Sequence, residues 1–310
     1  MKFNPRARLR TNQVRDTRGS RGGSIARSPV ALGGGGLGIV GIVIYLIVAF
    51  AGGSSSSAVT DVLGQLGQGS GPATADNRQL AAECRTGVDA NNKRDCALVA
   101  SIDSIQDYWA RALPKLGTRY VPAPTIWFTG RVNTACGAAT SGVGPFYCPA
   151  DNRVYIDLSF YDQLRTDFGA RGGPFVDAYV LAHEYGHHVQ DLLGVESRVK
   201  PGVTGPSSGS VRLELQADCY AGVWARNATR SPGPGGQPVI SQITRDDIAR
   251  ALDAAKRIGD DYIQTHLGNG TNNPSSYTHG TSAQREKWFT TGYGTGDPRA
   301  CDTFSTNNLG

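Results

Sequence analysis

The sequence Val180-Leu-Ala-His183-Glu184-Tyr-Gly-His187-His188-Val-Gln190 contains the pattern His-Glu-x-x-His within an apolar, helix-compatible run. On a helix that turns by about 100° per residue, His183 and His187 lie one turn apart on one face, so both imidazoles can reach one metal ion. Glu184 is turned about 100° from His183, which places its carboxylate beside the ion as a candidate general base. The pattern therefore predicts a zinc site on a helix. His188 points about 140° away from His183 and is expected to be a neighbour of the site or a surface residue, not a ligand.

A second helix is predicted to complete this site. Residues 211–225 have helical apolar spacing and carry acids at Glu214 and Asp218. A catalytic zinc takes three protein ligands and leaves a fourth position for water, so the two histidines need a partner. Glu214 is the predicted third ligand, and Asp218, one turn further along, is predicted to accept the free imidazole N–H of a zinc-bound histidine. The alternative, an exposed acidic stripe, fits the apolar flanking residues less well.

The positive charge of the chain is concentrated at its N-terminus. The whole chain has 31 basic and 26 acidic residues, and eight of the basic residues but one of the acidic ones lie within residues 1–27. The rest of the chain has 23 basic and 25 acidic residues, a net charge of −2. A nucleic-acid-binding domain needs a basic face, so this composition gives no support for a nucleic-acid partner.

Residues 30–53 are all apolar, Gly or Tyr, and a helix of that length can cross a bilayer. We expect a transmembrane signal anchor at residues 28–53, with residues 1–27 as a basic cytoplasmic tail under the positive-inside rule. A flexible Gly/Ser linker at 54–76 and an extracytoplasmic domain at 77–310 would follow. In the alternative, the segment is a long signal peptide cleaved after Ala49-Phe50-Ala51, and the protein is secreted.

The cysteines are consistent with export. There are six, an even number, in a chain that is expected to leave the reducing cytoplasm. Six cysteines allow fifteen pairings, which the sequence does not distinguish. We favour pairs between near neighbours across loop-like segments, with the remaining two paired by elimination. These pairs are Cys84 with Cys96, Cys136 with Cys148, and Cys219 with Cys301.

The remaining periodicity predicts an α+β domain that is mainly helical with a small β-sheet. An apolar stripe from Leu98 to Leu113 predicts a helix that ends at Pro114. Strands are predicted at 125–129 and 154–160, and the second alternates in the manner of a half-buried edge strand. Further helices are expected at 161–168, at 174–193 before Gly194, at 211–225, and after a capping box that begins at Thr244.

Several segments together resemble the neutral zinc metallopeptidase family of bacteria, over roughly residues 77 to 304. Members of this family are commonly anchored in the membrane at the N-terminus. The resemblance implies a zincin-like domain with peptidase activity, with His183, His187 and Glu214 as ligands and Glu184 as the catalytic base. The segments that carry it are His183–Gln190, Glu214–Gly222, Gly144–Cys148, Val154–Asp157 and Thr278–Arg285.

The function expected from these residues is hydrolysis of a protein or peptide substrate with Zn²⁺ as cofactor, in a membrane-anchored protein. His279 and Tyr277 lie in a polar segment with Arg285 and are candidates to stabilise the oxyanion, although a structural loop histidine fits the pattern equally well. His266 is expected at the surface. One alternative is an envelope binding or assembly protein whose zinc is structural or vestigial, with four closed ligands. Another is a zinc hydrolase that cleaves a non-peptide amide of the envelope.

Overall fold

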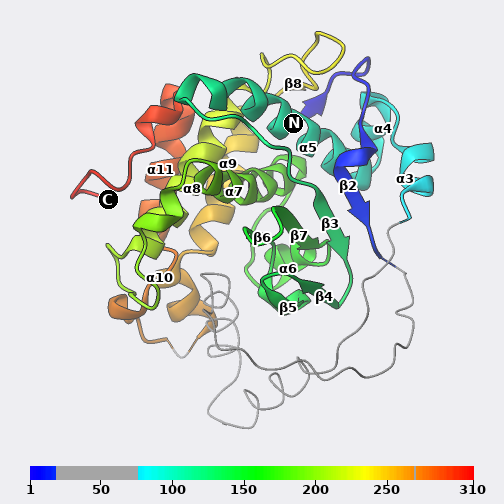
Figure 1. Ribbon diagram of the computed structural model, residues 1–310. Coiled ribbons are helices and arrows are strands. Elements are labelled where there is room, and N and C mark those ends of the chain that lie inside the picture. The colour runs from blue at the N-terminus through cyan, green and yellow to red at the C-terminus, as the bar shows by residue number, and fades with distance from the viewer. Residues whose placement is uncertain (19–75, 269) are drawn as a thin grey trace.

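The computed structural model describes residues 1–18, 76–268 and 270–310 (Figure 1). The helices are α3 (Arg78–Glu83), α4 (Gly87–Asn92), α5 (Arg94–Ala112), α6 (Phe160–Thr166), α7 (Pro174–Leu192), α8 (Gly209–Asn227), α9 (Arg245–Arg257), α10 (Asp260–Tyr262) and α11 (Ser282–Thr295), and the π-helical turn η5 spans Ile263–Leu267. The strands are β1 (Lys2–Phe3), β2 (Val14–Asp16), β3 (Thr125–Phe128), β4 (Arg131–Thr134), β5 (Gly137–Thr140), β6 (Phe146–Cys148), β7 (Arg153–Asp157) and β8 (Ile240–Gln242). These elements confirm the predicted mixture of helices and a small sheet.

The main sheet has four strands in the order β2-β3-β7-β6, of which β6 alone is antiparallel to its neighbour. Side chains alternate between its faces, so Trp127 joins the core shared with the helices while Ile126 and Phe128 pack on the opposite face. Strand β7 lies between β3 and β6, so the prediction of an edge strand was wrong. The last residue of β7, Asp157, is buried, and its carboxylate is satisfied by hydrogen bonds from the backbone N–H of Gly130 and the hydroxyl of Ser141.

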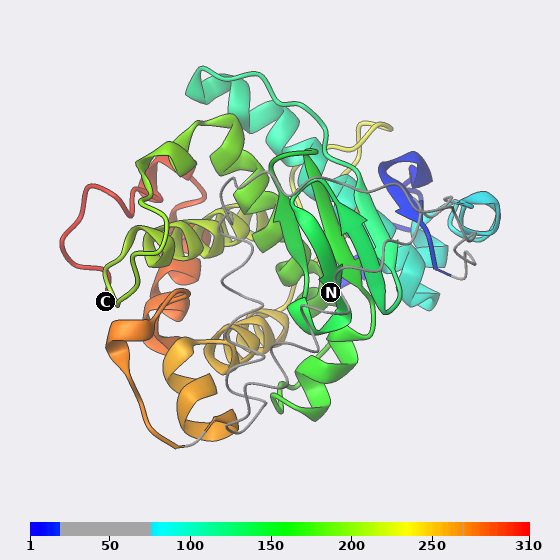
Figure 2. The same cartoon turned by 60° about the horizontal axis from the view of Figure 1, so that its bottom comes forward.

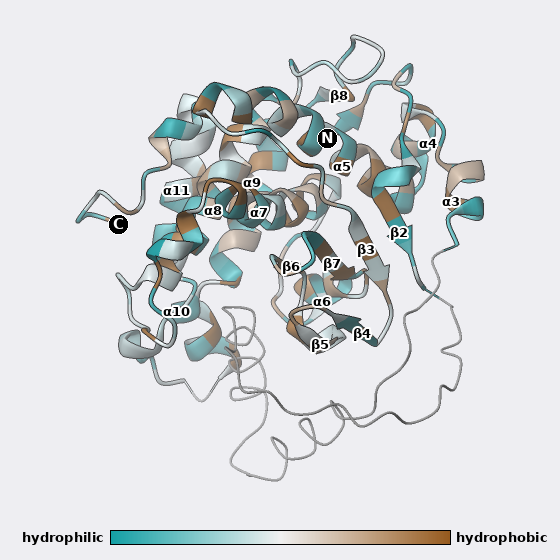
Figure 3. Cartoon of the chain, in the orientation of Figure 1, coloured by the Kyte–Doolittle hydropathy of each residue, from teal (hydrophilic) through white to brown (hydrophobic). Residues whose placement is uncertain are grey.

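The long helices pack beside this sheet, as the two views in Figures 1 and 2 show. Hydrophobic residues on α5, β3 and β7 (Figure 3) belong to the buried core. Helices α8 and α11 approach each other unusually closely through two glycines. A Cβ at Gly222 would lie 2.2 Å from the carbonyl oxygen of Phe289, and one at Gly292 would lie 1.9 Å from that of Cys219. Any other residue at either position would force the two helices apart.

Residues 1–18 are part of the folded domain. Strand β2 pairs with β3 in the main sheet, and β1 pairs with β8. Arg10, one of the basic residues near the N-terminus, donates to the carboxylates of Asp103 and Asp107 on α5. Strands joined by backbone hydrogen bonds cannot lie on opposite sides of a membrane. The prediction of a tail separate from the domain is therefore wrong for residues 1–18, in which Arg10 and Arg18 pair with acidic side chains of α5.

The predicted anchor at residues 28–53 and almost all of the predicted linker at 54–76 lie outside the described residues. Among the residues that the structure describes, no helix combines the length and apolar character needed to span a bilayer.

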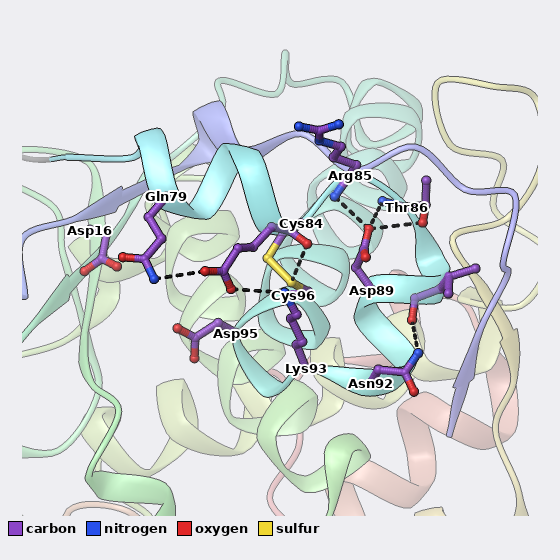
Figure 4. Close-up of a disulfide and its surroundings, with 12 residues drawn as sticks. Asp16, Gln79, Cys84, Arg85, Thr86, Asp89, Asn92, Lys93, Asp95 and Cys96 are labelled. Atoms are coloured by element: carbon purple, nitrogen blue, oxygen red, sulfur yellow. Dashed lines mark hydrogen bonds and ion pairs between the residues drawn. A yellow bond between two sulfur atoms is a disulfide. The ribbon is translucent and has the colours of Figure 1, made fainter.

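All three predicted disulfides form. Cys84–Cys96 joins the end of α3 to α5 (Figure 4). Cys136–Cys148 joins the turn of the β4–β5 hairpin to the end of β6, and Cys219–Cys301 ties α8 to the C-terminal segment across 82 residues. Near the first bridge, Glu83 accepts hydrogen bonds from Gln79 and Lys93.

Candidate metal centre

Helix α7 carries the first two candidate ligands. Its start is set by Gly173, whose φ of 128° is open to glycine, and by Pro174 at the first helical position. The helix ends before Gly194, which has a φ of 69°. Both boundaries agree with the sequence prediction, and His183 and His187 lie one turn apart on the resulting helix.

Helix α8 comes close enough to α7 to supply a third ligand because a glycine lies at their crossing. A Cβ on Gly186 would lie 2.9 Å from the Cα of Ala217 and 3.1 Å from its Cβ. The pairing of a glycine with an alanine therefore sets the separation of the two helices. Glu214, one turn before Ala217 on α8, is brought to the histidines as a consequence.

The three predicted ligands converge on one point. The Nε2 atoms of His183 and His187 lie 3.2 Å apart, and the carboxylate of Glu214 lies 3.1 Å from the first and 3.5 Å from the second. In a tetrahedral zinc site with bonds of about 2.0–2.1 Å, ligand atoms are about 3.3 Å apart. The observed spacings fit that ion, and two nitrogens with one carboxylate are a common donor set for zinc.

The outer ring nitrogens of both histidines are held by hydrogen bonds. His183 donates from Nδ1 to Asp218 at 2.9 Å, and His187 donates from Nδ1 to Oε1 of Gln190 at 2.9 Å. The amide nitrogen of Gln190 donates to the carbonyl of Leu213, so its oxygen must be an acceptor. Each Nδ1 therefore carries a hydrogen in the metal-binding tautomer, which leaves the lone pairs of both Nε2 atoms directed at the ion position.

Asp218 is the centre of a fully buried network. Arg285 donates to both of its oxygens, at 2.8 and 3.0 Å, and the hydroxyl of Tyr179 donates to Oδ1 at 2.6 Å. Asp218 has no exposed surface, and 3% of Arg285 is exposed. The carboxylate that orients His183 is thus itself oriented by a buried guanidinium from α11.

The electrostatics of the metal-free cluster favour a proton where the metal would bind. Burial alone would lower the pKa of His183, but the carboxylates of Asp218 and Glu214 outweigh it and raise that pKa to about 10. Burial acts to raise the pKa of Glu214, but His187, His279 and His183 hold it well below its usual range. The pKa of Glu184 is raised, chiefly by burial. Glu184 is therefore a stronger base than an exposed glutamate would be.

The ligands open into a cleft of about 950 Å³ that Glu184 and His279 also line. His279 is held by Asp260, which is 2% exposed. One oxygen of Asp260 accepts the backbone N–H groups of residues 278, 279 and 280 at 2.7 to 2.9 Å, and the other lies 3.4 Å from His279 Nδ1. Thr278 Oγ1 lies 2.9 Å from the same nitrogen. His279 Nε2 is the ring nitrogen left for a ligand in the cleft.

The other predicted residues lie elsewhere. Tyr277 is buried, its hydroxyl donates to Asn272, and it does not line the cleft, so its assignment as an oxyanion partner was wrong. His188 is not a ligand, as expected, but it is fully buried and contacts Tyr147 and the carbonyl of Val121. His266 is exposed, as expected.

Sequence reasoning missed Gln190 and Asp260. Gln190 follows His187 by three residues on one helix, a spacing that could have indicated contact. Asp260 is distant in sequence from His279 and gave no such signal.

A helical His-Glu-x-x-His motif that is completed by a glutamate on a neighbouring helix and faces a cleft is typical of zinc metallopeptidases. The chain belongs to the family described as "Putative neutral zinc metallopeptidase", whose model matches residues 1–304. The match extends the resemblance seen in the sequence to the N-terminus, in agreement with the folding of residues 1–18 onto the domain.

The relatives come from several bacteria. The chain is 50% identical over 229 residues to "Uncharacterized protein Rv2575" of Mycobacterium tuberculosis, covering 74% of this chain and 76% of the relative. It is 36% identical over 305 residues to "Uncharacterized protein YpfJ" of Escherichia coli K12, covering 96% of this chain and 97% of the relative. No solved structure matches the chain significantly.

Proposed function

We propose that the protein is a zinc-dependent peptidase that hydrolyses peptide bonds, with Glu184 as the general base. The observation that carries this proposal is the convergence of His183, His187 and Glu214 at zinc-like spacings on the wall of an open cleft. A zinc ion held by these three residues would supply a Lewis acid that lowers the pKa of water and polarises a carbonyl group.

The side chains around the site have distinct roles in this proposal. Glu184 takes a proton from the attacking water and returns it to the leaving nitrogen, a task helped by its raised pKa. His279 directs Nε2 at the carbonyl oxygen and donates a hydrogen bond as negative charge develops there. Asp218 and Gln190 hold His183 and His187 in the metal-binding orientation.

Structural zinc in a binding or assembly protein is supported less well. A structural site is closed by four protein ligands. Among the described residues, the cluster that could hold a metal contains three. These three line a cleft that is large enough for a substrate segment, which favours catalysis.

We also propose that the folded domain works outside the cytoplasm. Its three disulfides support an oxidising compartment. The apolar composition of residues 30–53 supports attachment to the membrane. Membrane fractionation of cells that express the full chain, with and without this segment, tests the attachment.

The test of the function is cleavage of a denatured, fluorescently labelled protein by the purified full chain. We expect zinc-dependent cleavage that a chelator abolishes and added zinc restores. Glu184→Gln should bind one zinc per chain and cleave at least about a thousandfold more slowly. Glu286→Gln, which alters a partly exposed carboxylate on α11 paired with Lys256, is the matched control. Equal cleavage by Glu184→Gln and the parent would show that Glu184 is not the base.

A further inference from the structure

One wall of the cleft is apolar and only partly covered by the protein. It is formed by Ile258 after α9, by Ile263 and Leu267 in η5, and by Phe168 after α6. These four side chains are all partly or largely exposed, and Leu267 reaches 37%. Covering such open apolar surface with an apolar ligand removes it from water, which favours binding.

The backbone of this wall is also unusual. Residues 263–267 form a π-helical turn, an arrangement that is rare and is frequently found at functional sites. It places Ile263, Gln264 and Leu267 on the cleft, while Thr265 and His266 are exposed outside the set of cleft-lining residues. The turn therefore presents two aliphatic side chains to the same cavity as the metal ligands.

The charges of the cleft are unsuited to carboxylate groups. No lysine of the described chain lines it, and its one arginine, Arg285, gives its guanidinium to Asp218. Asp167 and Glu196 line it without a salt bridge among the described residues, and burial raises the pKa of Glu196 to about 7, so Glu196 repels a carboxylate more strongly as the pH rises above 7. Away from the metal position, a substrate carboxylate would therefore lose its hydration and lie near Asp167 and Glu196, with no lysine or unpaired arginine of the described chain to bind it.

From these observations, and resting on the proposed peptidase function, we infer that the enzyme is an endopeptidase for segments with bulky apolar side chains. It cleaves bonds inside a chain, next to a Leu- or Phe-like residue that packs on Ile258, Ile263 and Leu267. It discriminates against substrates with a carboxylate near the bond, whether this is an acidic side chain or the C-terminal carboxylate. Water adds across the amide, which yields a new carboxylate and a new amine.

The experiment uses the zinc-loaded full chain and quenched fluorescent peptides blocked at both ends. One peptide with Leu and Phe at its centre is compared with versions in which these residues are Ala or Asp, and with a version whose free C-terminal carboxylate lies one residue from the bond. We expect kcat/KM to fall at least about tenfold for Ala and further for both carboxylate-bearing peptides.

Two variants connect this preference to the wall. Leu267→Ser should lower kcat/KM about tenfold for the Leu/Phe peptide and little for the Ala peptide. Val88→Ser changes a hydrophobic side chain that is 50% exposed on α4, outside the cleft lining, and should change neither. The double variant Asp167→Asn/Glu196→Gln should improve cleavage of the Asp peptide relative to the Leu/Phe peptide.

The possible outcomes separate this inference from the proposed function. Equal cleavage of all blocked peptides would overturn the apolar preference while leaving the peptidase function intact. Cleavage restricted to the peptide with a free C-terminal carboxylate would overturn the endopeptidase assignment. No cleavage of any peptide or denatured protein by a zinc-loaded chain would refute the proposed function itself.

Discussion

Replacing Asp218 with Asn tests whether the buried network beneath His183 controls the metal site. Asp218 is fully buried and accepts hydrogen bonds from His183, Tyr179 and the Nε and Nη2 atoms of Arg285. The Asn amide must direct its N–H groups toward a guanidinium that has no acceptor atom. The substitution also leaves the positive charge of Arg285 buried and without a carboxylate partner. Removing one partner of such a pair costs about 3–5 kcal/mol.

Two measurements follow from this change. The free energy of unfolding of the metal-free protein, measured in urea, should fall by about 3–5 kcal/mol. The Kd for zinc, measured by competition with a chromophoric chelator, should rise about 10- to 100-fold because His183 loses the carboxylate that orients it.

A double-mutant cycle with Arg285→Met tests whether the loss of stability comes from the unpaired charge. Asp218→Asn/Arg285→Met should lose about 1–3 kcal/mol less than the sum of the two single variants, since neither charge is then left alone. Asp297→Asn, which breaks an exposed pair with Arg299, is the control and should cost less than about 1 kcal/mol. Additive single effects, or a loss in Asp218→Asn no larger than in the control, would refute this account of the network.

Four further predictions concern the same site. Gly186→Ala places a Cβ 2.9 Å from the Cα of Ala217, so it should push α8 away and weaken zinc binding at least about tenfold. In the metal-free protein, the stability that protonated His183 contributes should be present in full below pH 6.5 and be lost as the pH rises through about 10. For the same reason, the apparent zinc affinity should rise up to about tenfold per pH unit below pH 10, because binding releases that proton. Asp260→Asn should lower kcat about 10- to 100-fold with zinc still bound, because it loosens the loop that aims His279.

Each of these predictions has a decisive measurement. For Gly186→Ala, chelator competition with an unchanged Kd would show that the helix separation is not critical. For His183, urea unfolding of the metal-free protein across the pH range should reveal the loss, and an equal loss in His183→Gln would assign it to another group. For Asp260→Asn, a change in KM alone would indicate substrate binding, whereas restored kcat in Asp260→Glu would support positioning of His279.

The metal ligands could be predicted from the sequence because their geometry is local or nearly so. His183 and His187 are one turn apart on one helix, and a helical hairpin brings Glu214 within reach. Hydrogen bonds over long sequence distances could not be predicted in this way. Asp260 reaches His279 through a loop whose path depends on the packing of α11, for which the sequence alone has no periodic signal.

The N-terminal segment shows how composition can mislead. Its arginines suggested the cytoplasmic flank of an anchor, yet Arg10 binds Asp103 and Asp107 on α5, and Arg18 binds Asp95. A basic residue paired inside a fold and one in a cytoplasmic tail are identical in a charge count. The short strands β1 and β2 are too brief to produce a recognisable alternation.

The backbone N–H of Asp76 donates to the carbonyl of Asp16 at 3.0 Å, so the chain leaves the domain and returns to it at nearly one place. The folded domain is therefore discontinuous in sequence, built from two pieces with residues 19–75 inserted between them. A short linker from residue 18 to residue 76 would preserve every contact described above and remove the apolar stretch. Conversely, cleavage after Ala51 would leave the N-terminal piece bound by strand pairing and side-chain contacts alone.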